Sequence, residues 1–291
     1  MKKTSFCIFP VFAVILASCG TQEPKFTPLF DGVSLNGWEI HIGVPDSSVA
    51  VAGLERNEKG LYAQPLGGND PLSVFSVVEA DGEPAIRASG QIYGSLATVA
   101  EYGNYHLRLE AKWGDKKWAP REDKPRNAGV LYHGTGKFGK GLGVWKTSHE
   151  CQVQETMFGD SYRMGETYCN ITASRASEND RYVFDPDAPA ITFGHDLPAG
   201  PICAKNPENE KPAGEWNVIE VLCCEDVSVH VINGKTNMVN TDSHLRVNGQ
   251  KTPLVKGVIQ LQSEGAEIYY RRVEIRPISS IPDSYLKTNL P

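Results

Sequence analysis

Apolar and polar side chains alternate along most of this chain, with the period of a β-strand rather than of a helix. The segment Tyr105–Trp113 is the clearest case, because its apolar residues share one face and its charged residues share the other. Further strands are expected at residues 71–79, 85–88, 93–101, 127–133, 149–155, 162–173, 215–224, 227–232, 235–239, 257–263 and 266–275. No segment has a convincing amphipathic helical pattern. Many short strands separated by turn residues predict an all-β sandwich.

Turn residues suggest how some of these strands connect. Asn233-Gly234 is typical of a two-residue hairpin turn, and Glu264-Gly265 suggests a hairpin between the strands at 257–263 and 266–275. The segment 174–214 is rich in proline and acidic residues, and a loop of this length is usually functional, so we expect a lid or a cleft wall. No shift in composition divides the chain. We therefore expect one domain over residues 26–279 and a tail over residues 280–291.

The N-terminus is typical of a processing signal. Lys2 and Lys3 precede an apolar run that ends in Leu16-Ala17-Ser18-Cys19, the pattern of a lipobox. We expect a lipoprotein signal peptide over residues 1–18, a lipid-modified Cys19 and a short tether over residues 19–25. This predicts a lipid-anchored protein of the bacterial cell envelope, on the periplasmic or outer-surface side of a membrane.

Charge and cysteine content narrow the classes of partner. The net charge is −6 and no basic patch is interleaved with aromatic residues, so a nucleic acid is not expected as a partner. Five cysteines would remain after Cys7 and Cys19 are set aside, an odd number that requires at least one free thiol. One disulfide, for example from Cys203, stays open, and no Cys-x-x-Cys spacing indicates zinc.

The stretch at 149–155 carries the most unusual polar pattern. If it is one regular strand, Glu150, Gln152 and Gln154 share one face, whereas His149 and Glu155 lie on the other. A carboxylate and two amides in a row are not expected in an apolar core. Such a face meets either solvent or a polar cleft, and the pattern alone does not choose between them.

Several motifs, taken in order, give a family resemblance. They are LFDGVSLNGW at 29–38, NAGVLY at 127–132, Trp145 with SHECQVQE and Gly159-Asp160, EWNVIEV at 215–221, HVINGK at 230–235, and GVIQLQSEGAEIYYRRVEI at 257–275. Over residues 26–277 the chain resembles the 3-keto-disaccharide hydrolase domain family. The resemblance implies a concanavalin A-like jelly-roll β-sandwich of two antiparallel sheets with a concave sugar-binding face.

The same resemblance implies chemistry on 3-keto-glycosides, whose glycosidic bond breaks by elimination. A ketone at C3 acidifies the proton at C2, so a base, an acid and a donor to the enolate are needed. Glu150, His230 and Arg271 are the candidate catalytic residues. The candidate substrate-binding residues are Gln152, Tyr132, Trp145, Asp160, Tyr168 and Gln262. Where many family members have a histidine before the turn glycine, this chain has Glu264.

Two other classes of function stay open at this point. One is a non-catalytic carbohydrate-binding lipoprotein, because a fold does not fix a function. The other is a direct glycoside hydrolase, which needs two carboxylates at a defined separation, but Gln152 and Gln154 stand where further acids would be expected. No cofactor is indicated, although a divalent cation stays open. The glycine-rich segment 134–143 lacks the context of a phosphate loop and suggests a cleft loop, and Asp185-Pro186-Asp187 is a weak signal for a calcium ion.

Overall fold

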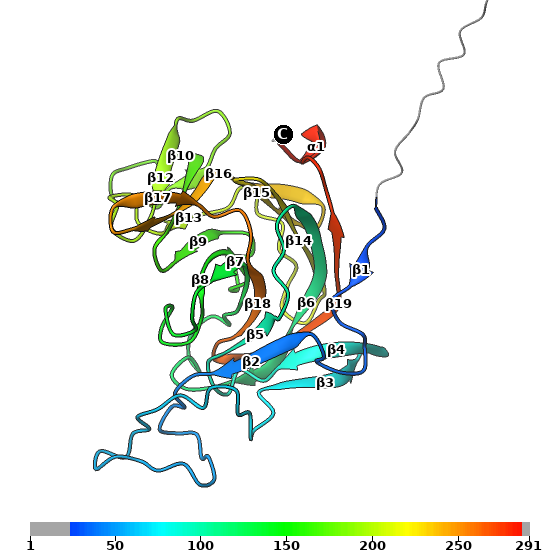
Figure 1. Ribbon diagram of the computed structural model, residues 1–291, viewed down its shortest axis with the longest axis vertical. Helices are drawn as coiled ribbons and strands as arrows, with labels where there is room; N and C mark the ends of the chain where they lie inside the picture. Colours follow the sequence, from blue (N-terminus) through cyan, green and yellow to red (C-terminus); the bar gives the residue numbers. More distant parts are fainter. Residues whose placement is uncertain (1–23, 287–291) are drawn as a thin grey trace, which may run out of the picture.

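The computed structural model describes residues 24–286 and forms a sandwich of two antiparallel β-sheets (Figure 1). The larger sheet has twelve strands, in the order β11-β10-β16-β15-β14-β6-β19-β4-β3, with β1, β12 and β17 paired at its sides. These strands are β1 (Thr27–Pro28), β3 (Phe75–Ala80), β4 (Glu83–Ala88), β6 (Tyr105–Lys117), β10 (Thr167–Ser174), β11 (Val183–Phe184), β12 (Ala190–Phe193), β14 (Asn217–Cys224), β15 (Val227–Ile232), β16 (Lys235–Val247), β17 (Gln250–Pro253) and β19 (Ala266–Pro277).

The smaller sheet has seven strands in the order β13-β9-β8-β7-β18-β5-β2. They are β2 (Trp38–Ile42), β5 (Gly94–Thr98), β7 (Gly129–Thr135), β8 (Thr147–Gln152), β9 (Ser161–Met164), β13 (Ile202–Cys203) and β18 (Val258–Ser263). One short helix, α1 (Asp283–Leu286), follows the last strand and lies near β15 and β16. The expected all-β sandwich of two antiparallel sheets is confirmed.

The hairpin expected at Asn233-Gly234 is confirmed. Ile232 on β15 pairs with Lys235 on β16, which leaves two residues in the turn. Both turn residues have positive φ, 49° for Asn233 and 79° for Gly234, as a type I′ turn requires.

The hairpin expected at Glu264-Gly265 is wrong. β18 pairs with β5 and β7 in the smaller sheet, whereas β19 pairs with β6 and β4 in the larger sheet. The chain therefore crosses from one sheet to the other at Gly265, whose φ is 78°. Two alternating runs joined by a tight turn look the same in sequence whether they pair or change sheets, so the pattern alone could not separate these cases.

A large apolar core fills the space between the sheets. It includes Leu107 and Leu109 from β6 and Leu261 from β18. At one end of the sandwich the interior becomes polar, where His149, Arg163 and His230 are fully or almost fully buried. The segment 174–214 is not without structure, because it contributes β11, β12 and β13.

Candidate functional site

A cavity of about 520 Å³ lies on the outer face of the smaller sheet. Its lining residues on the strands, such as Glu150 and Gln262, alternate with core residues such as Cys151 and Leu261, so they point away from the interior of the sandwich. The lining residues are Asn127, Lys140, Gly141, Leu142, Trp145, Glu150, Gln152, Tyr162, Met164, Gly165, Glu166, His195, Gln262 and Glu264. Lys140, Gly141 and Leu142 come from the glycine-rich segment, and His195 comes from the long segment expected to form a cleft wall.

Three neighbouring strands bring Glu150, Gln152 and Gln262 together. β8 ends at Gln152, which pairs with Gly129 on β7, and β18 lies on the other side of β7. Gly129 has no side chain, so the carboxyl of Glu150 and the amide of Gln262 extend over it. The polar face at 149–155 is thus a cleft face, and it ends at Gln152. Gln154 lies beyond the strand and accepts a hydrogen bond from Arg121 Nη2 at 3.2 Å.

We expect Gly129→Ala to disable the site while the fold is kept. A Cβ at this position would lie 2.1 Å from Glu150 Oε1 and 2.7 Å from Gln262 Oε1, so both side chains would have to move. A displacement of this size at a reacting group lowers the rate by about 100-fold. The assay of glycoside cleavage described below measures this loss.

Gly68→Ala is the matched control, because the nearest atom to its Cβ would be Ile40 O at 3.8 Å and its φ is not positive. Both variants should have melting temperatures close to that of the wild type. Full activity of Gly129→Ala would contradict the placement of Glu150 and Gln262 in the working site.

Two buried carboxyl groups give the cavity its electrostatic character. Burial raises the pKa of Glu150 well above its ordinary value, the negative charge of Glu264 raises it further, and Arg163 opposes the shift. Burial also raises the pKa of Glu264 to about 7, against the opposing effects of Arg121 and Asn127. A carboxyl group whose pKa is raised can deliver a proton as an acid, and one that is partly ionised at neutral pH can accept a proton as a base.

Glu264, like the lining residue Asn127, was not among the site residues predicted from the sequence. It lies at the crossing between the sheets, where its Oε1 is 3.7 Å from Arg121 Nη1 and its backbone bridges to Asn127. The only sequence signal was its position, which many family members fill with histidine. Glutamate and histidine are both ionisable, so the glutamate keeps the capacity for proton transfer at this position.

Unsatisfied amide oxygens mark the polar part of the cavity. Within residues 24–286, the buried Oδ1 of Asn127 and the buried Oε1 of Gln262 have no hydrogen-bond partner. Buried polar atoms are nearly always paired in folded proteins, so such atoms in a cavity wall suit a ligand that donates hydrogen bonds. Sugar hydroxyl groups are donors of this kind.

Trp145 lines the cavity but is not a free stacking platform. Its side chain is almost fully buried, its Nε1 donates to the Gly94 carbonyl at 3.0 Å, and its ring stacks on Tyr93. Tyr162 and His195 complete this wall, with their rings edge to face at 5.6 Å. His195 Nε2 donates to the Arg163 carbonyl at 2.8 Å, which fixes the orientation of the imidazole.

His230 and Tyr132 lie inside the sandwich and not in the cavity. His230 Nδ1 donates to the Gly159 carbonyl at 3.0 Å, so its Nε2 accepts from the Tyr132 hydroxyl at 3.0 Å. Burial lowers the pKa of His230 to about 3. The structure therefore does not place this imidazole where it could exchange a proton with a ligand in the cavity. Its place on an alternating strand did not show which face was inward.

Arg271 lies on the outer face of the larger sheet, so the structure does not bring it to the cavity. Its Nε donates to Glu110 at 2.7 Å, its Nη1 is 3.3 Å from Glu83, and its guanidinium lies 4.0 Å from the ring centre of Trp216. The predicted role beside the substrate was based on the family resemblance of the last strand. Because the chain changes sheets at Gly265, Arg271 is carried to the opposite side of the molecule.

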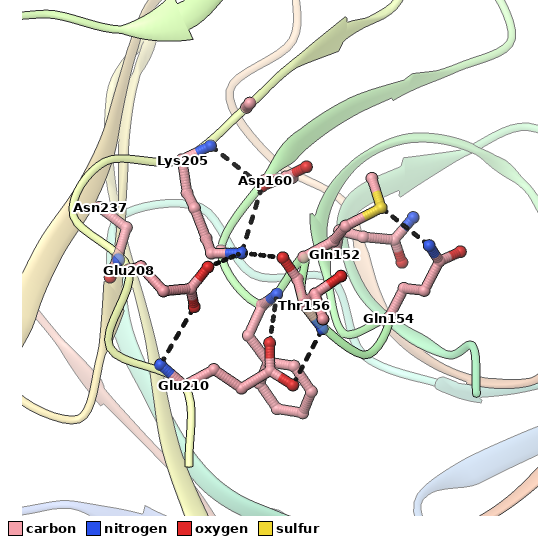
Figure 2. Close-up of polar contacts among 12 residues, drawn as sticks. Gln152, Gln154, Thr156, Asp160, Lys205, Glu208, Glu210 and Asn237 are labelled. Carbon is pink, nitrogen blue, oxygen red and sulfur yellow. Dashed lines mark hydrogen bonds and ion pairs between the residues drawn. The ribbon is translucent and has the colours of Figure 1, made fainter. Parts of the chain in front are cut away.

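Asp160 and Tyr168 also lie outside the cavity. Figure 2 shows Asp160 facing Lys205, whose backbone N donates to Asp160 Oδ1 at 3.0 Å and whose Nζ lies 3.9 Å from it. Asp160, with a pKa raised to about 6 by burial, thus holds the turn after β8 against the segment near Glu208. The Tyr168 hydroxyl donates to Asp196 at 2.7 Å, and its ring stacks on His244.

The remaining predictions concern thiols, metals and the N-terminus. Cys203 and the other described cysteines, at 151, 169, 223 and 224, are free. Residues 24–286 contain no group of three His, Cys, Asp or Glu side chains arranged to hold a metal ion. Asp185 and Asp187 therefore belong to no such group. The described residues contain no helix long and apolar enough to span a membrane. Cys19 and the signal at residues 1–18 lie outside the described residues.

Comparison with protein families identifies the chain. A model of the 3-keto-α-glucoside 1,2-lyase-like domain matches residues 25–276. The chain belongs to this family. The family resemblance expected from the motifs is confirmed, and no functionally curated protein matches the sequence.

Three solved structures of low sequence identity each match more than two thirds of the chain. A Parabacteroides distasonis protein titled "putative glycosyl hydrolase" is 18% identical, with 87% of this chain and 94% of the other covered and a TM-score of 0.44. A Bacillus subtilis protein of unknown function with a galectin-like fold is 8% identical, with 84% and 90% covered and a TM-score of 0.43. The carbohydrate-binding module CBM66 from Bacillus subtilis is 8% identical, with 69% and 91% covered and a TM-score of 0.41.

Proposed function

We propose that this member of the 3-keto-α-glucoside 1,2-lyase-like family cleaves the glycosidic bond of 3-keto-glycosides by elimination, with Glu264 as base and Glu150 as acid. The observation that carries the proposal is the pair of buried carboxyl groups in one cavity, each with a raised pKa. Asn127 and Gln262, whose buried oxygens are unpaired within the described chain, would bind the sugar hydroxyl groups.

The proposed roles follow from the charges around the two carboxyl groups. The negative charge of Glu264 favours the protonated form of Glu150, so Glu150 would be the acid. The Arg121 guanidinium, 3.7 Å away, favours the ionised form of Glu264, so Glu264 would remove the proton from C2. The electrons of this C–H bond form the C1=C2 double bond as the C1–O bond breaks. Glu150 would give its proton to the departing oxygen. Addition of water across the double bond, with OH at C1 and H at C2, then yields 3-keto-glucose.

The decisive experiment is to incubate the purified mature protein with a 3-keto-glucoside and with the unoxidised parent glycoside in D₂O. We expect aglycone release from the keto form alone, with deuterium at C2 of the 3-keto-glucose, because only elimination breaks the C2–H bond. Mass spectrometry and NMR measure both products. Authentic 3-keto-glucose incubated without protein corrects for spontaneous exchange. Formation of 3-keto-glucose that carries only protium at C2 would contradict elimination followed by addition of water.

Direct hydrolysis is the second candidate function, and the second carboxyl group favours it. A glycoside hydrolase needs two carboxyl groups beside the scissile bond, and Glu264 supplies the partner of Glu150 that the sequence did not indicate. Release of the aglycone from the unoxidised parent would support this function. Binding of either compound without release would support a carbohydrate-binding protein instead.

We further propose that Cys19 anchors the mature protein to a membrane of the cell envelope. The support is the lipobox pattern at Leu16–Cys19. An envelope location suits an enzyme whose substrates are glycosides taken from outside the cell.

A further inference from the structure

The cavity changes from polar to apolar along the direction of the strands. Glu150 pairs with Tyr162, and two residues further along β8 Ser148 pairs with Met164. Gln152, two residues in the other direction, pairs with Gly129 beside Gln262. Glu150 therefore stands between an amide-lined end and an end that contains Met164.

The end near Met164 is built from apolar side chains. Trp145 and Met164 belong to one buried cluster on this face of the sheet, with Leu131 and Val144, and Tyr93 and Tyr162 pack against it. Leu142 adds its side chain from the glycine-rich segment. The charged residues here, Lys140 and Glu166, lie 3.7 Å apart as an ion pair with both side chains about half exposed. They stand at the solvent side of the apolar wall.

Leu142 lines the cavity with an exposed side chain and an unfavourable backbone conformation. Its exposed fraction is 73%, and its φ of 43° lies in the left-handed region that leucine rarely adopts. Backbone hydrogen bonds between Gly141 and Trp145 close the turn that carries it. A Cβ on Gly141 would lie 2.0 Å from Met164 Sδ, so glycine is needed for the turn to approach Met164. An exposed leucine held in this way suits contact with a bound apolar group.

We propose that the apolar end binds the leaving group of the substrate, and that this leaving group is an apolar ring rather than a second sugar. The inference rests on the proposed function, which places the sugar at the amide-lined end and the scissile C1–O bond at Glu150. The leaving group must then extend past Glu150 towards Leu142, Trp145 and Met164. A second sugar there would lose water from its hydroxyl groups against carbon and sulfur atoms that cannot replace those hydrogen bonds.

The test compares two 3-keto-glucosides whose leaving alcohols have nearly equal acidity, the benzyl and the methyl glucoside. Any preference between them then reports contact with the leaving group rather than its chemical reactivity. We expect kcat/KM to be higher for the benzyl compound by about 10-fold to 100-fold, because specificity for extra apolar atoms in a pocket has this size. A 3-keto-disaccharide should be a poorer substrate than the benzyl compound. Equal rates for benzyl and methyl compounds, or a preference for the disaccharide, would overturn the inference.

Leu142→Asn tests the subsite directly. Asparagine tolerates the left-handed conformation, so the turn should keep its shape while the apolar contact is lost. We expect the ratio of benzyl to methyl kcat/KM to fall about fivefold, in keeping with the loss of part of the burial of a leucine side chain. Val33→Asn is the control, because Val33 is 82% exposed and does not line the cavity. An unchanged ratio in Leu142→Asn would overturn the inference.

Binding to Glu150→Gln protein separates this inference from the proposed function. If neither keto compound is cleaved by the wild type, the proposed function fails, but calorimetry still compares the affinity for the two compounds. Tighter binding of the benzyl compound, weakened by Leu142→Asn, would support the apolar subsite alone. Equal affinities would overturn it whatever the outcome for cleavage.

Discussion

Glu150→Gln is expected to slow the release of an alkyl alcohol from a 3-keto-glucoside by about 1,000-fold, because the variant lacks the proton that the departing oxygen needs. Glutamine has nearly the same shape as the protonated carboxylic acid and can still donate a hydrogen bond beside Gln262 and Tyr162. It cannot transfer a proton. Steady-state kinetics with the methyl and benzyl compounds measure the loss in kcat, and the melting temperature reports whether the fold is retained.

The leaving group decides whether the lost function is that of an acid. A nitrophenol departs as a stable anion and needs no proton, so its 3-keto-glucoside should lose far less rate in Glu150→Gln than the alkyl compounds do. Arg271→Met, a change on the outer face of the larger sheet, should leave both rates as in the wild type. Equal losses for alkyl and nitrophenyl compounds would rule out the acid role, and wild-type rates would remove Glu150 from the mechanism.

The fold could be predicted from the sequence because its signals are local. Alternation indicates the longer strands such as β6, β14 and β19, but β2, β11, β12, β13 and β17 were not expected from it. The Asn233-Gly234 turn gives a hairpin whose geometry depends on the two residues themselves. The crossing at Gly265 could not be predicted in this way. Whether β18 and β19 pair with each other or with strands far away in the chain depends on which faces are buried. All six residues of β18 are buried, since one of its faces meets the core and the other meets the cleft.

The predicted residues that line the cavity lie on the central strands of the smaller sheet or, like Trp145, close to the start of one. Glu150, Gln152 and Gln262 share the cavity with Trp145, because alternation sets their common face once the strand order is known. His230 and Arg271 are polar residues on equally regular strands, yet one points into the sandwich and the other lies on the far sheet. Alternation fixes which residues share a face, but it does not say which face is inside.

Glu264 shows what a difference from relatives can reveal. A glutamate in place of histidine changes the kind of ionisable group at this position. The structure adds that burial in the cavity raises the pKa of this glutamate to about 7, into the range where histidine titrates. Burial can therefore supply a base near neutrality from a residue whose ordinary pKa is too low.

Glu264→Gln is expected to lower kcat by about 1,000-fold for every leaving group, nitrophenol included. The reason is that removal of the C2 proton precedes or accompanies the departure of each leaving group. Deuterium should no longer enter C2 above the spontaneous rate. The wild-type rate should rise with pH through the pKa of about 7, since the base acts only when ionised, and this rise should vanish in the variant. At higher pH the wild-type rate should fall as Glu150 loses its proton. Because the charge of Glu264 raises the pKa of Glu150, this fall should move to lower pH in Glu264→Gln.

Glu264→His tests whether Glu264 acts as a base or has only a structural role. An imidazole titrates near neutral pH, so histidine should recover a substantial part of the rate and the deuterium exchange, although it cannot reproduce the contacts of glutamate with Arg121 and Asn127. Glutamine preserves the shape of glutamate better than histidine does. A purely structural residue would therefore give the opposite order, with Glu264→Gln more active than Glu264→His. If that order is found, the base must be sought elsewhere in the cavity, where His195 supplies an imidazole at the wall.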